Sequence, residues 1–342
     1  MDLAERSLVP DPLVRWGIRR LLRARLAEVC AASRTGERAF RERMRRSPIA
    51  LHTDAANAQH YELPSAFFEA VLGPHLKYSS ALWNRGTRSL AEAEQAMLEL
   101  TAQRAQLRDG DDILELGCGW GSLSLHMAAT LPGSRITAVS NSASQRRFVT
   151  ERARQRGLIN LEVITADMNV FDPQRRFDRV VSVEMFEHMR NWERLIGRVS
   201  EWLHPGGTLF VHVFSHRDHC YAFEPRTERD WMARHFFTGG MMPSHGLPAQ
   251  LDLPLELQQS FVVEGTHYAR TADAWLEHLD ARRDELRPLF EQTYGRRDAE
   301  RWIERWRMFF MSCSELFGYR GGREWHVSHH LLRKPGSGER RI

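Results

Sequence analysis

Cysteine is scarce in this chain, and long apolar runs are absent. Among 342 residues there are four cysteines, Cys30, Cys118, Cys220 and Cys313, and no two have metal-site or redox spacing. We therefore expect reduced thiols, as is usual in the cytoplasm. No stretch is long and apolar enough to span a bilayer, and arginines occupy the first thirty residues, where a signal peptide needs an apolar centre. These absences predict a cytoplasmic globular protein.

Excess positive charge is missing from most of the chain. The net charge is +4, but residues 1–50 alone contain 12 arginines and six acidic residues, so the remainder is slightly acidic. A nucleic-acid-binding protein should carry a broad basic face with interleaved aromatics, so we predict no nucleic-acid partner. Helical periodicity over Leu13–Val29 and Glu37–Arg46 predicts a basic arm. It either contacts anionic lipid weakly, or packs on the body or a second subunit in a homodimer.

A glycine-rich stretch at 111–121 organises the rest of the chain. An apolar run suited to a buried strand is followed by glycines at alternate positions and then by a helix-prone segment. Glycine lets the backbone approach a ligand, and the first helical turn offers N–H donors. The spacing E-x-G-x-G-x-G differs from the dinucleotide fingerprint and resembles the first motif of class I S-adenosylmethionine (SAM) methyltransferases. The matching residues are Glu115, Gly117, Gly119 and Gly121.

Strands and helices alternate beyond this stretch. Strands are predicted over 134–140, 161–165, 177–183 and 208–214, with helices over 142–156 and 192–203. This alternation, together with the resemblance, predicts an α/β fold built on a doubly wound, mostly parallel, seven-stranded Rossmann-like sheet. Ligands bind at the carboxyl ends of the strands in such a sheet. Among the polar residues at these ends are Ser140, Asn141, Asp167 and His212.

The alternation stops at residues 215–320. This segment is rich in tryptophan and phenylalanine, with helices predicted near 271–286 and 298–316 and one strand near Phe261–Tyr268. We interpret it as a helical cover over the strand ends. The predicted division is a basic helical arm (1–56), a SAM-dependent methyltransferase domain (57–334) and a flexible tail (335–342). Within the domain, 57–110 form a helical cap, 111–214 the SAM-binding core, 215–320 the cover with its late strand, and 321–334 the last strand.

Titratable side chains are densest just after the fourth predicted strand. On a tight turn or a first helical turn, Glu184, Glu187 and His188 lie at i, i+3 and i+4, on one side. Two carboxylates beside an imidazole can shift one another's pKa toward neutrality, which suits a general base. The alternative is a helix N-terminus whose acidic residues complement the helix dipole. His212 and two later histidines have metal-like spacing, but no acidic or cysteine cluster accompanies them, so we predict no metal.

From about Leu8 to Lys334 the chain resembles the plant coclaurine-type N-methyltransferases, within the cyclopropane-fatty-acyl-phospholipid synthase superfamily. The matching stretches are QHYELP (59–64), LKYSS (76–80), LELGCGWG (114–121), SNSASQ (140–145), EMFEHM (184–189), FFTGG (236–240) and LFGY (316–319). The resemblance implies catalytic or substrate-binding roles for Glu184, Glu187 and His188. It also implies SAM contacts from Tyr78, Ser79, Gly117, Gly119, Ser140, Gln145 and Asp167.

The two branches of this superfamily differ at position 184. The resemblance implies that cyclopropane synthases carry glycine there and amine methyltransferases glutamate. It also implies that the synthases hold a bicarbonate ion, which serves as base, in a polar cage. The corresponding positions here are Glu187, His212 and Tyr268, with Ser80 in place of a cysteine and Phe214 in place of a small aliphatic residue.

We therefore expect a SAM-dependent methyltransferase that N-methylates a small aromatic or alkaloid-like amine, with Glu184 and His188 accepting the amine proton. The alternative is a cyclopropane-fatty-acyl-phospholipid synthase or lipid methyltransferase acting on unsaturated acyl chains at a membrane surface. A non-catalytic SAM-binding scaffold is disfavoured because the site residues are intact. A DNA methyltransferase is disfavoured because Val183–Phe186 lack the Asn/Asp-Pro-Pro-aromatic motif.

Overall fold

The computed structural model describes residues 2–31, 34–51, 63–225, 230–336 and 338. At its centre, seven strands of the described residues form one sheet in the order β3-β2-β1-β4-β5-β9-β8. Neighbouring strands are parallel from β3 to β5, whereas β9 is antiparallel to both β5 and β8. The predicted doubly wound, mostly parallel sheet is confirmed. The strands are β1 (Asp112–Leu116), β2 (Arg135–Ser140), β3 (Leu161–Thr165), β4 (Phe177–Val183), β5 (Leu203–His216), β8 (Glu256–Val263) and β9 (Trp325–Arg333).

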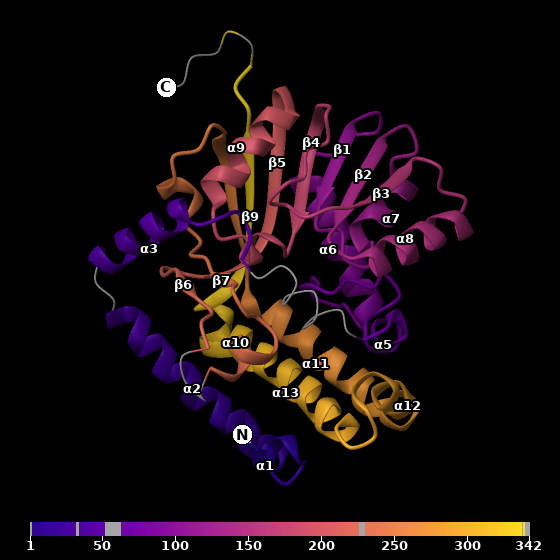
Figure 1. Ribbon diagram of the computed structural model, residues 1–342, viewed down its shortest axis with the longest axis vertical. Coiled ribbons are helices and arrows are strands. Elements are labelled where there is room, and N and C mark those ends of the chain that lie inside the picture. The colour runs from indigo at the N-terminus through magenta and orange to yellow at the C-terminus, as the bar shows by residue number, and fades with distance from the viewer. Residues whose placement is uncertain (1, 32–33, 52–62, 226–229, 337, 339–342) are drawn as a thin grey trace.

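Helices cover both faces of the sheet (Figure 1). Leu98 and Leu123 pack against one face, and Leu195 and Val199 against the other. Short 3₁₀ turns lie at η1 (Phe186–His188), η2 (Pro248–Gln250) and η3 (Tyr319–Gly322), and β6 (Tyr221–Ala222) pairs with β7 (Met241–Met242). The helices are α1 (Asp2–Glu5), α2 (Asp11–Ala31), α3 (Arg34–Arg46), α5 (Ser65–Val71), α6 (Leu90–Arg104), α7 (Ser122–Thr130), α8 (Ala143–Gln155), α9 (Trp192–Trp202), α10 (Trp231–His235), α11 (Gly265–Ala281), α12 (Arg283–Tyr294) and α13 (Ala299–Gly318).

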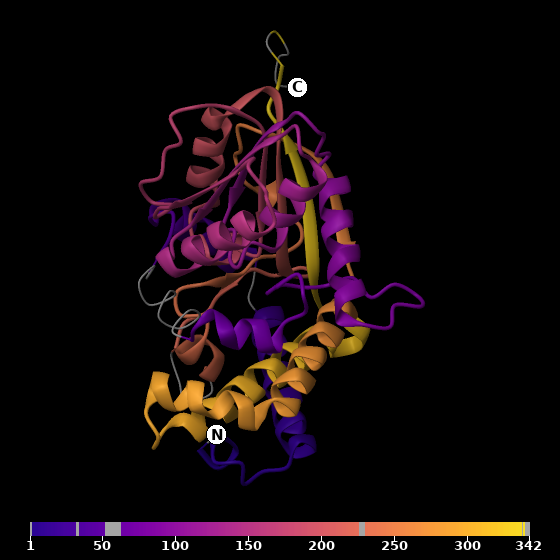
Figure 2. The same ribbon diagram turned by 90° about the vertical axis from the view of Figure 1, so that its right-hand side faces the viewer.

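The helices α10 to α13 lie beyond the carboxyl ends of the central strands, as Figures 1 and 2 show from two sides. Their interior is aromatic: the rings of Phe236 and Phe309 stack with centroids 4.3 Å apart, and Trp306 is fully buried between them and Phe67 of α5. Aromatic side chains remove much apolar surface from water, so they supply the core of this cover. The cover closes the edge at which ligands bind in this fold.

One predicted strand is misplaced. The strand β8 ends at Val263 and the helix α11 begins at Gly265, so Tyr268 lies on a helix. A Cβ atom at Gly265 would lie 2.1 Å from the Trp325 carbonyl oxygen and 2.3 Å from that of Phe317. The backbone therefore passes through a gap that only glycine fits, and the chain leaves the sheet there. The helix predicted over 271–286 is likewise two helices, α11 and α12, that meet at residue 282.

The basic arm packs on the body of the protein. Ile18 and Leu26 of α2 belong to the same apolar core as the cover helices. Arg15 donates to Asp273 at 2.7 Å, and Arg19 donates to Glu315 at 2.9 Å.

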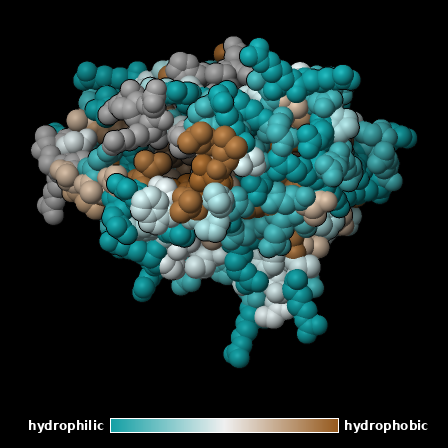
Figure 3. Space-filling view, turned by 90° about the horizontal axis from the view of Figure 1, so that it is seen from below, coloured by the Kyte–Doolittle hydropathy of each residue, from teal (hydrophilic) through white to brown (hydrophobic). Residues whose placement is uncertain are grey.

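The face of the molecule that is seen from below is mostly hydrophilic (Figure 3). Among the residues that the structure describes, no helix combines the length and apolarity needed to cross a membrane.

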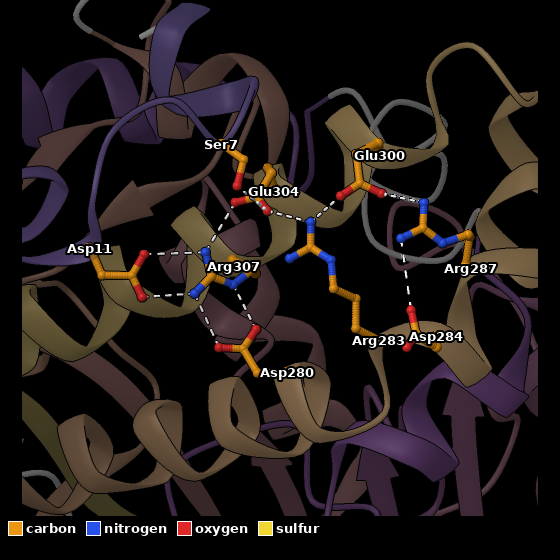
Figure 4. A network of polar contacts seen from close by, with 9 residues as sticks. All are labelled: Ser7, Asp11, Asp280, Arg283, Asp284, Arg287, Glu300, Glu304 and Arg307. Atoms are coloured by element: carbon orange, nitrogen blue, oxygen red, sulfur yellow. Dashed lines mark hydrogen bonds and ion pairs between the residues drawn. The ribbon is translucent and has the colours of Figure 1, made fainter.

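Arg307 of α13 joins three segments through ion pairs (Figure 4). Its guanidinium lies 2.7 Å from Asp11 of α2, 2.6 Å from Asp280 of α11 and 3.0 Å from Glu304 on its own helix. The Glu304 side chain is 3% exposed and is also paired with Arg283 at 2.6 Å. The Arg307 and Glu304 side chains are largely removed from water, so each depends on its partners, whereas Asp11 and Asp280 are each 40% exposed. The network ties the arm to the cover.

We expect Arg307→Met to lower the thermal unfolding midpoint by about 5 °C, since it removes one of the two cations paired with the buried Glu304 and the ion pairs that join α13 to Asp11 and Asp280. Arg154→Met is the matched control, because Arg154 pairs with Glu151 on the exposed surface of α8 and should change little. Circular dichroism melts of both variants test this. Equal midpoints would show that the network does not stabilise the fold.

Candidate active site

A pocket with about 900 Å³ of empty space, part of it open to solvent, lies at the carboxyl ends of β1 and β4. It receives side chains from the loop before α6, from the glycine turn, from η1 and from the cover. The structure thus brings together residues that are far apart in sequence. The predicted site residues that line it are Tyr78, Ser79, Glu115, Gly117, Gly119, Gln145, Glu184, Glu187, His188, Phe214 and Tyr268.

The glycine turn has the backbone that its sequence predicts. Gly117, Gly119 and Gly121 all have positive φ, at 81°, 53° and 81°, a region that favours glycine. The N–H groups of Gly117 and Cys118 both donate to the Val139 carbonyl at 2.9 Å, which fixes the turn against β2. A Cβ atom at Gly117 would lie 2.8 Å from the Met185 Cβ, whereas one at Gly119 would meet no atom within 4 Å. The turn is therefore closely packed against Met185 at Gly117, whereas Gly119 leaves space for a ligand.

Glu115, at the end of β1, and Gln145, on α8, both line this pocket. The Glu115 carboxylate accepts a hydrogen bond from the Ser124 hydroxyl, and burial raises its pKa to about 7. The Ser140 hydroxyl donates to the Gln145 side-chain oxygen at 2.6 Å. The Gln145 amide nitrogen is buried and has no hydrogen-bond partner among the described residues. This buried donor is available to an acceptor on a bound ligand.

Some predicted residues lie at this edge without lining the pocket. Ser140 acts through Gln145, and the Asp167 carboxylate accepts the Asn169 N–H at 2.7 Å. Gly121 is the N-cap of α7, and a Cβ atom there would lie 2.7 Å from Val149. The remaining residues of this group are Asn141, which follows β2, and Ser80 and His212, which contact Glu184.

The Glu184 carboxylate is held by donors from three other segments. One oxygen lies 3.0 Å from the Ser80 backbone nitrogen and 3.2 Å from His212 Nε2, and the other accepts the Tyr268 hydroxyl at 2.6 Å. Glu184 itself has a φ of 48°, which is uncommon for a residue with a side chain. The tight turn after β4 thus directs the carboxylate toward Ser80, His212 and Tyr268, which the resemblance places, together with Glu187 and Phe214, around the bicarbonate site of the synthases.

Glu187 and His188 lie on η1, directly after Glu184. All three line the pocket, as predicted, although the turn is a 3₁₀ turn and not the start of an α-helix. Burial, together with the charge of Glu184, raises the pKa of Glu187 well above its usual range. Burial also raises the pKa of Glu184, while the Lys77 charge and the hydrogen bonds from Tyr268 and Ser80 oppose this rise. Burial lowers the pKa of His188 to about 4, which leaves a neutral imidazole.

Two buried charged residues near the site, Lys77 and Glu94, were not predicted from the sequence. Lys77 is buried beside Ser79, and burial lowers its pKa to about 8 against the opposing charges of Glu184 and Glu94. Glu94 accepts the N–H groups of Gly73 and His75 at 3.0 and 2.9 Å, and burial raises its pKa to about 7. A carboxylate on the apolar face of a predicted helix was the available signal for Glu94. Its partners could not be inferred, because they come from the preceding loop.

Aromatic side chains from the cover complete the pocket. Phe237, Phe309 and Trp275 line it together with Phe214, and the His188 ring stacks on Phe237 with centroids 5.8 Å apart. Such rings exclude water and attract cations through their faces.

The histidines with metal-like spacing point to different partners. His212 faces Glu184, His216 Nε2 lies 3.8 Å from Glu324, and His219 Nδ1 lies 2.8 Å from Glu37. Within the described part of the chain, no three histidine, cysteine, aspartate or glutamate side chains are placed to hold a metal ion.

The residues at the glycine turn fit SAM. A buried carboxylate at Glu115, an unsatisfied donor at Gln145 and an open backbone at Gly119 provide complementary groups for a cationic nucleoside. The doubly wound sheet, its glycine turn and the proton acceptors beside it define a class I SAM-dependent methyltransferase. The chain belongs to the mycolic acid cyclopropane synthetase family, whose model matches residues 51–324.

Known proteins resemble the chain over most of its length. (S)-coclaurine N-methyltransferase from Thalictrum flavum subsp. glaucum is 37% identical over 338 residues, which cover 96% of this chain and 94% of that protein. A crystal structure of coclaurine N-methyltransferase bound to N-methylheliamine and SAH superposes with a TM-score of 0.93 at 35% identity, covering 97% and 98% of the two chains. Cyclopropane-fatty-acyl-phospholipid synthase from Escherichia coli K12 is 28% identical over 79% of this chain and 66% of that protein.

We expect Gly117→Ala to weaken SAM binding by about tenfold or more, because the added methyl group would meet Met185 and strain a left-handed residue. Gly197→Ala on α9 is the matched control, since a Cβ atom there would meet nothing within 4 Å. Titration calorimetry with SAM measures the affinity, and a thermal melt checks that each variant is folded. Wild-type affinity in folded Gly117→Ala would contradict a cofactor site at this turn.

Proposed function

We propose that the protein transfers a methyl group from SAM to the nitrogen of a small aromatic amine. The observation that carries this proposal is the Glu184 carboxylate, which is buried, held by three hydrogen bonds and placed in the same pocket as the glycine turn. Two relatives, at 37% and 31% identity, are named (S)-coclaurine N-methyltransferase and pavine N-methyltransferase.

The glycine-turn half of the pocket would hold the cofactor. We assign SAM contacts to Gly117, Gly119, Glu115 and Gln145, with Tyr78 and Ser79 at its polar end, while Gly121, Ser140, Asn141 and Asp167 shape the turn and strand ends around it. The sulfonium charge of SAM already activates its methyl group. The chain has therefore to align the amine nitrogen with that carbon and to exclude water, which the aromatic cover supports.

The residues at the η1 end of the pocket would accept the proton of the amine. A protonated amine has no lone pair, so a base must take the proton before the nitrogen–carbon bond forms and the carbon–sulfur bond breaks. The three donors around the Glu184 carboxylate favour its ionised form, so Glu184 would accept the proton, while the neutral imidazole of His188 beside it would orient the amine. Glu187 would orient the amine through its carboxyl group, one oxygen of which has no hydrogen-bond partner among the described residues.

The lipid alternative has a specific observation against it. The resemblance to the cyclopropane synthases implies that those enzymes hold a bicarbonate ion in a cage around positions 187, 212 and 268. Here the Glu184 carboxylate already accepts hydrogen bonds from Tyr268 and Ser80 and faces His212. A carboxylate of the chain thus stands where the lipid enzymes would need an added anion, and a second anion there would be repelled.

The other expectations stay predictions. These are the cytoplasmic location, the lack of a nucleic-acid partner, the weak lipid contact or homodimer through the arm, and the domain boundaries. The pairing of Arg15 and Arg19 with carboxylates of the body favours an arm that packs on the protein over one that docks on lipid.

We expect Glu184→Gln and His188→Ala each to lower turnover by roughly 10²-fold, because the first removes the proton acceptor and the second the imidazole that orients the amine beside it. SAM affinity should be retained in both. Glu99→Gln is the matched control, since Glu99 is an exposed carboxylate on α6. Steady-state kinetics with an amine substrate and calorimetry with SAM separate the two effects. Full turnover in both variants would remove the proposed base.

We expect methyl transfer to coclaurine-like amines and none to phospholipid. The protein is incubated with labelled SAM and either an amine panel or vesicles of unsaturated phospholipid. Both N-methylation and cyclopropanation add one CH₂ unit, so the product structure is solved by NMR. A cyclopropane ring in the lipid product, with no methylated amine, would overturn the proposal in favour of the lipid reading.

A further inference from the structure

A row of hydrogen bonds leads from the Glu184 carboxylate across the sheet to the helix α6. The Glu184 oxygen lies 3.2 Å from His212 Nε2, His212 Nδ1 lies 2.9 Å from His329 Nε2, and His329 Nδ1 lies 3.0 Å from an Arg104 nitrogen. His212 and His329 face each other directly on the antiparallel strands β5 and β9, which places their side chains on the same face of the sheet. Neither histidine is accessible to solvent.

Arg104, at the outer end of this row, fixes which atom donates in each of its hydrogen bonds. A guanidinium group can only donate, so His329 Nδ1 must accept from Arg104. Burial lowers the pKa of both histidines well below the usual value, so both rings are neutral, with one donor and one acceptor nitrogen. His329 therefore carries its proton on Nε2 and donates to His212 Nδ1. His212 in turn carries its proton on Nε2 and donates to Glu184.

We propose that Arg104 and His329 are positioning residues that fix the tautomer of His212 and thereby keep Glu184 in its ionised, proton-accepting form. The inference rests on the proposed role of Glu184 as a base. A row ending in arginine is not a path for protons to solvent, because arginine does not release its proton at working pH. Instead, the row keeps the proton of His212 on Nε2, so that this nitrogen always donates a hydrogen bond to the Glu184 carboxylate.

The opposite tautomer shows why the outer end matters. With Arg104 removed, a proton on His212 Nδ1 could point toward His329, and the His212 Nε2 lone pair would then face the Glu184 carboxylate. Two acceptors facing each other repel unless the carboxyl group is protonated. Loss of Arg104 would therefore favour protonated Glu184, which cannot accept the amine proton.

The side chain of Arg104 is held in place by a contact outside the active site. Its guanidinium lies over the Phe261 ring, 4.3 Å from the centroid, and Phe261 is the β8 neighbour of His329. The other titratable groups that act on Glu184 or on the two histidines stay the same when Arg104 is replaced. They are Lys77 before α6, Glu187 and His188 on η1, Tyr268 on α11, Cys313 on α13 and His330 on β9.

The test compares the pH dependence of turnover in Arg104→Met with that of the wild type. A lost donor to a carboxylate raises its pKa, so the acidic limb of the profile should move up by about one pH unit. Turnover near neutral pH should fall several-fold and recover in more alkaline buffer, while KM for SAM stays unchanged. Arg154→Met, on the surface of α8, should keep the wild-type profile.

A pair of variants at position 329 keeps the test independent of folding defects at Arg104. In His329→Gln the side-chain amide can still donate to His212 Nδ1, so the acidic limb should stay near the wild-type position. In His329→Leu the donor is lost, and the limb should move up as in Arg104→Met. Nitrogen-15 NMR of histidine-labelled protein reports the protonated nitrogen directly and needs no substrate: His212 should be protonated at Nε2 in the wild type and at Nδ1 in part in Arg104→Met.

The outcomes separate this inference from the proposed function. If Glu184→Gln is inactive but Arg104→Met and His329→Leu have the wild-type pH profile and tautomer, the positioning role is wrong and the base stands. If Glu184→Gln keeps full turnover, the base itself is wrong. A uniform loss of turnover at every pH in folded Arg104→Met, with no shift of the limb, would also overturn the positioning role.

Discussion

The buried carboxylate of Glu184 is the constraint on which the arrangement of this protein depends. Removing an ionised carboxylate from water costs several kcal/mol unless donors replace the water. Here the donors come from the Ser80 loop, from β5 and from α11, and the carboxylate itself from the turn after β4. Four segments must therefore meet at one point. The packing of the sheet against the cover is what brings them there.

The two halves of the pocket are built by different means. The cofactor half is formed largely by the backbone, since glycines at positive φ let the chain turn tightly between β1 and α7. The acceptor half is formed by side chains of distant segments, with charges balanced between Glu184, Glu187 and Lys77. The cofactor half therefore depends mainly on the glycine backbone, whereas the side chains of the acceptor half determine which nucleophile can bind.

The cover depends on both apolar packing and charge. Its aromatic interior packs α13 against α11, and Arg307 joins these helices to the arm through Asp11 and Asp280. The arm that appeared in the sequence as a separate basic segment is therefore part of one packed body. Charge counting alone cannot reveal this, because an arginine turned to solvent and one paired with a distant carboxylate have the same sequence pattern.

What the sequence determined by itself was the order of strands and helices, the glycine turn and the cluster at 184–188, because periodicity, glycine spacing and proximity along the chain are local properties. Local patterns failed at Tyr268, because the chain leaves the sheet at Gly265, where the Phe317 and Trp325 carbonyls leave no room for a Cβ atom. Only the tertiary structure decided that Lys77 and Glu94 share a buried site, and that Arg104 and His329 stand behind Glu184. The physical reason is that burial and hydrogen-bond direction depend on partners far away in the chain, such as Arg104 and His329, which are 225 residues apart, and no local pattern encodes these.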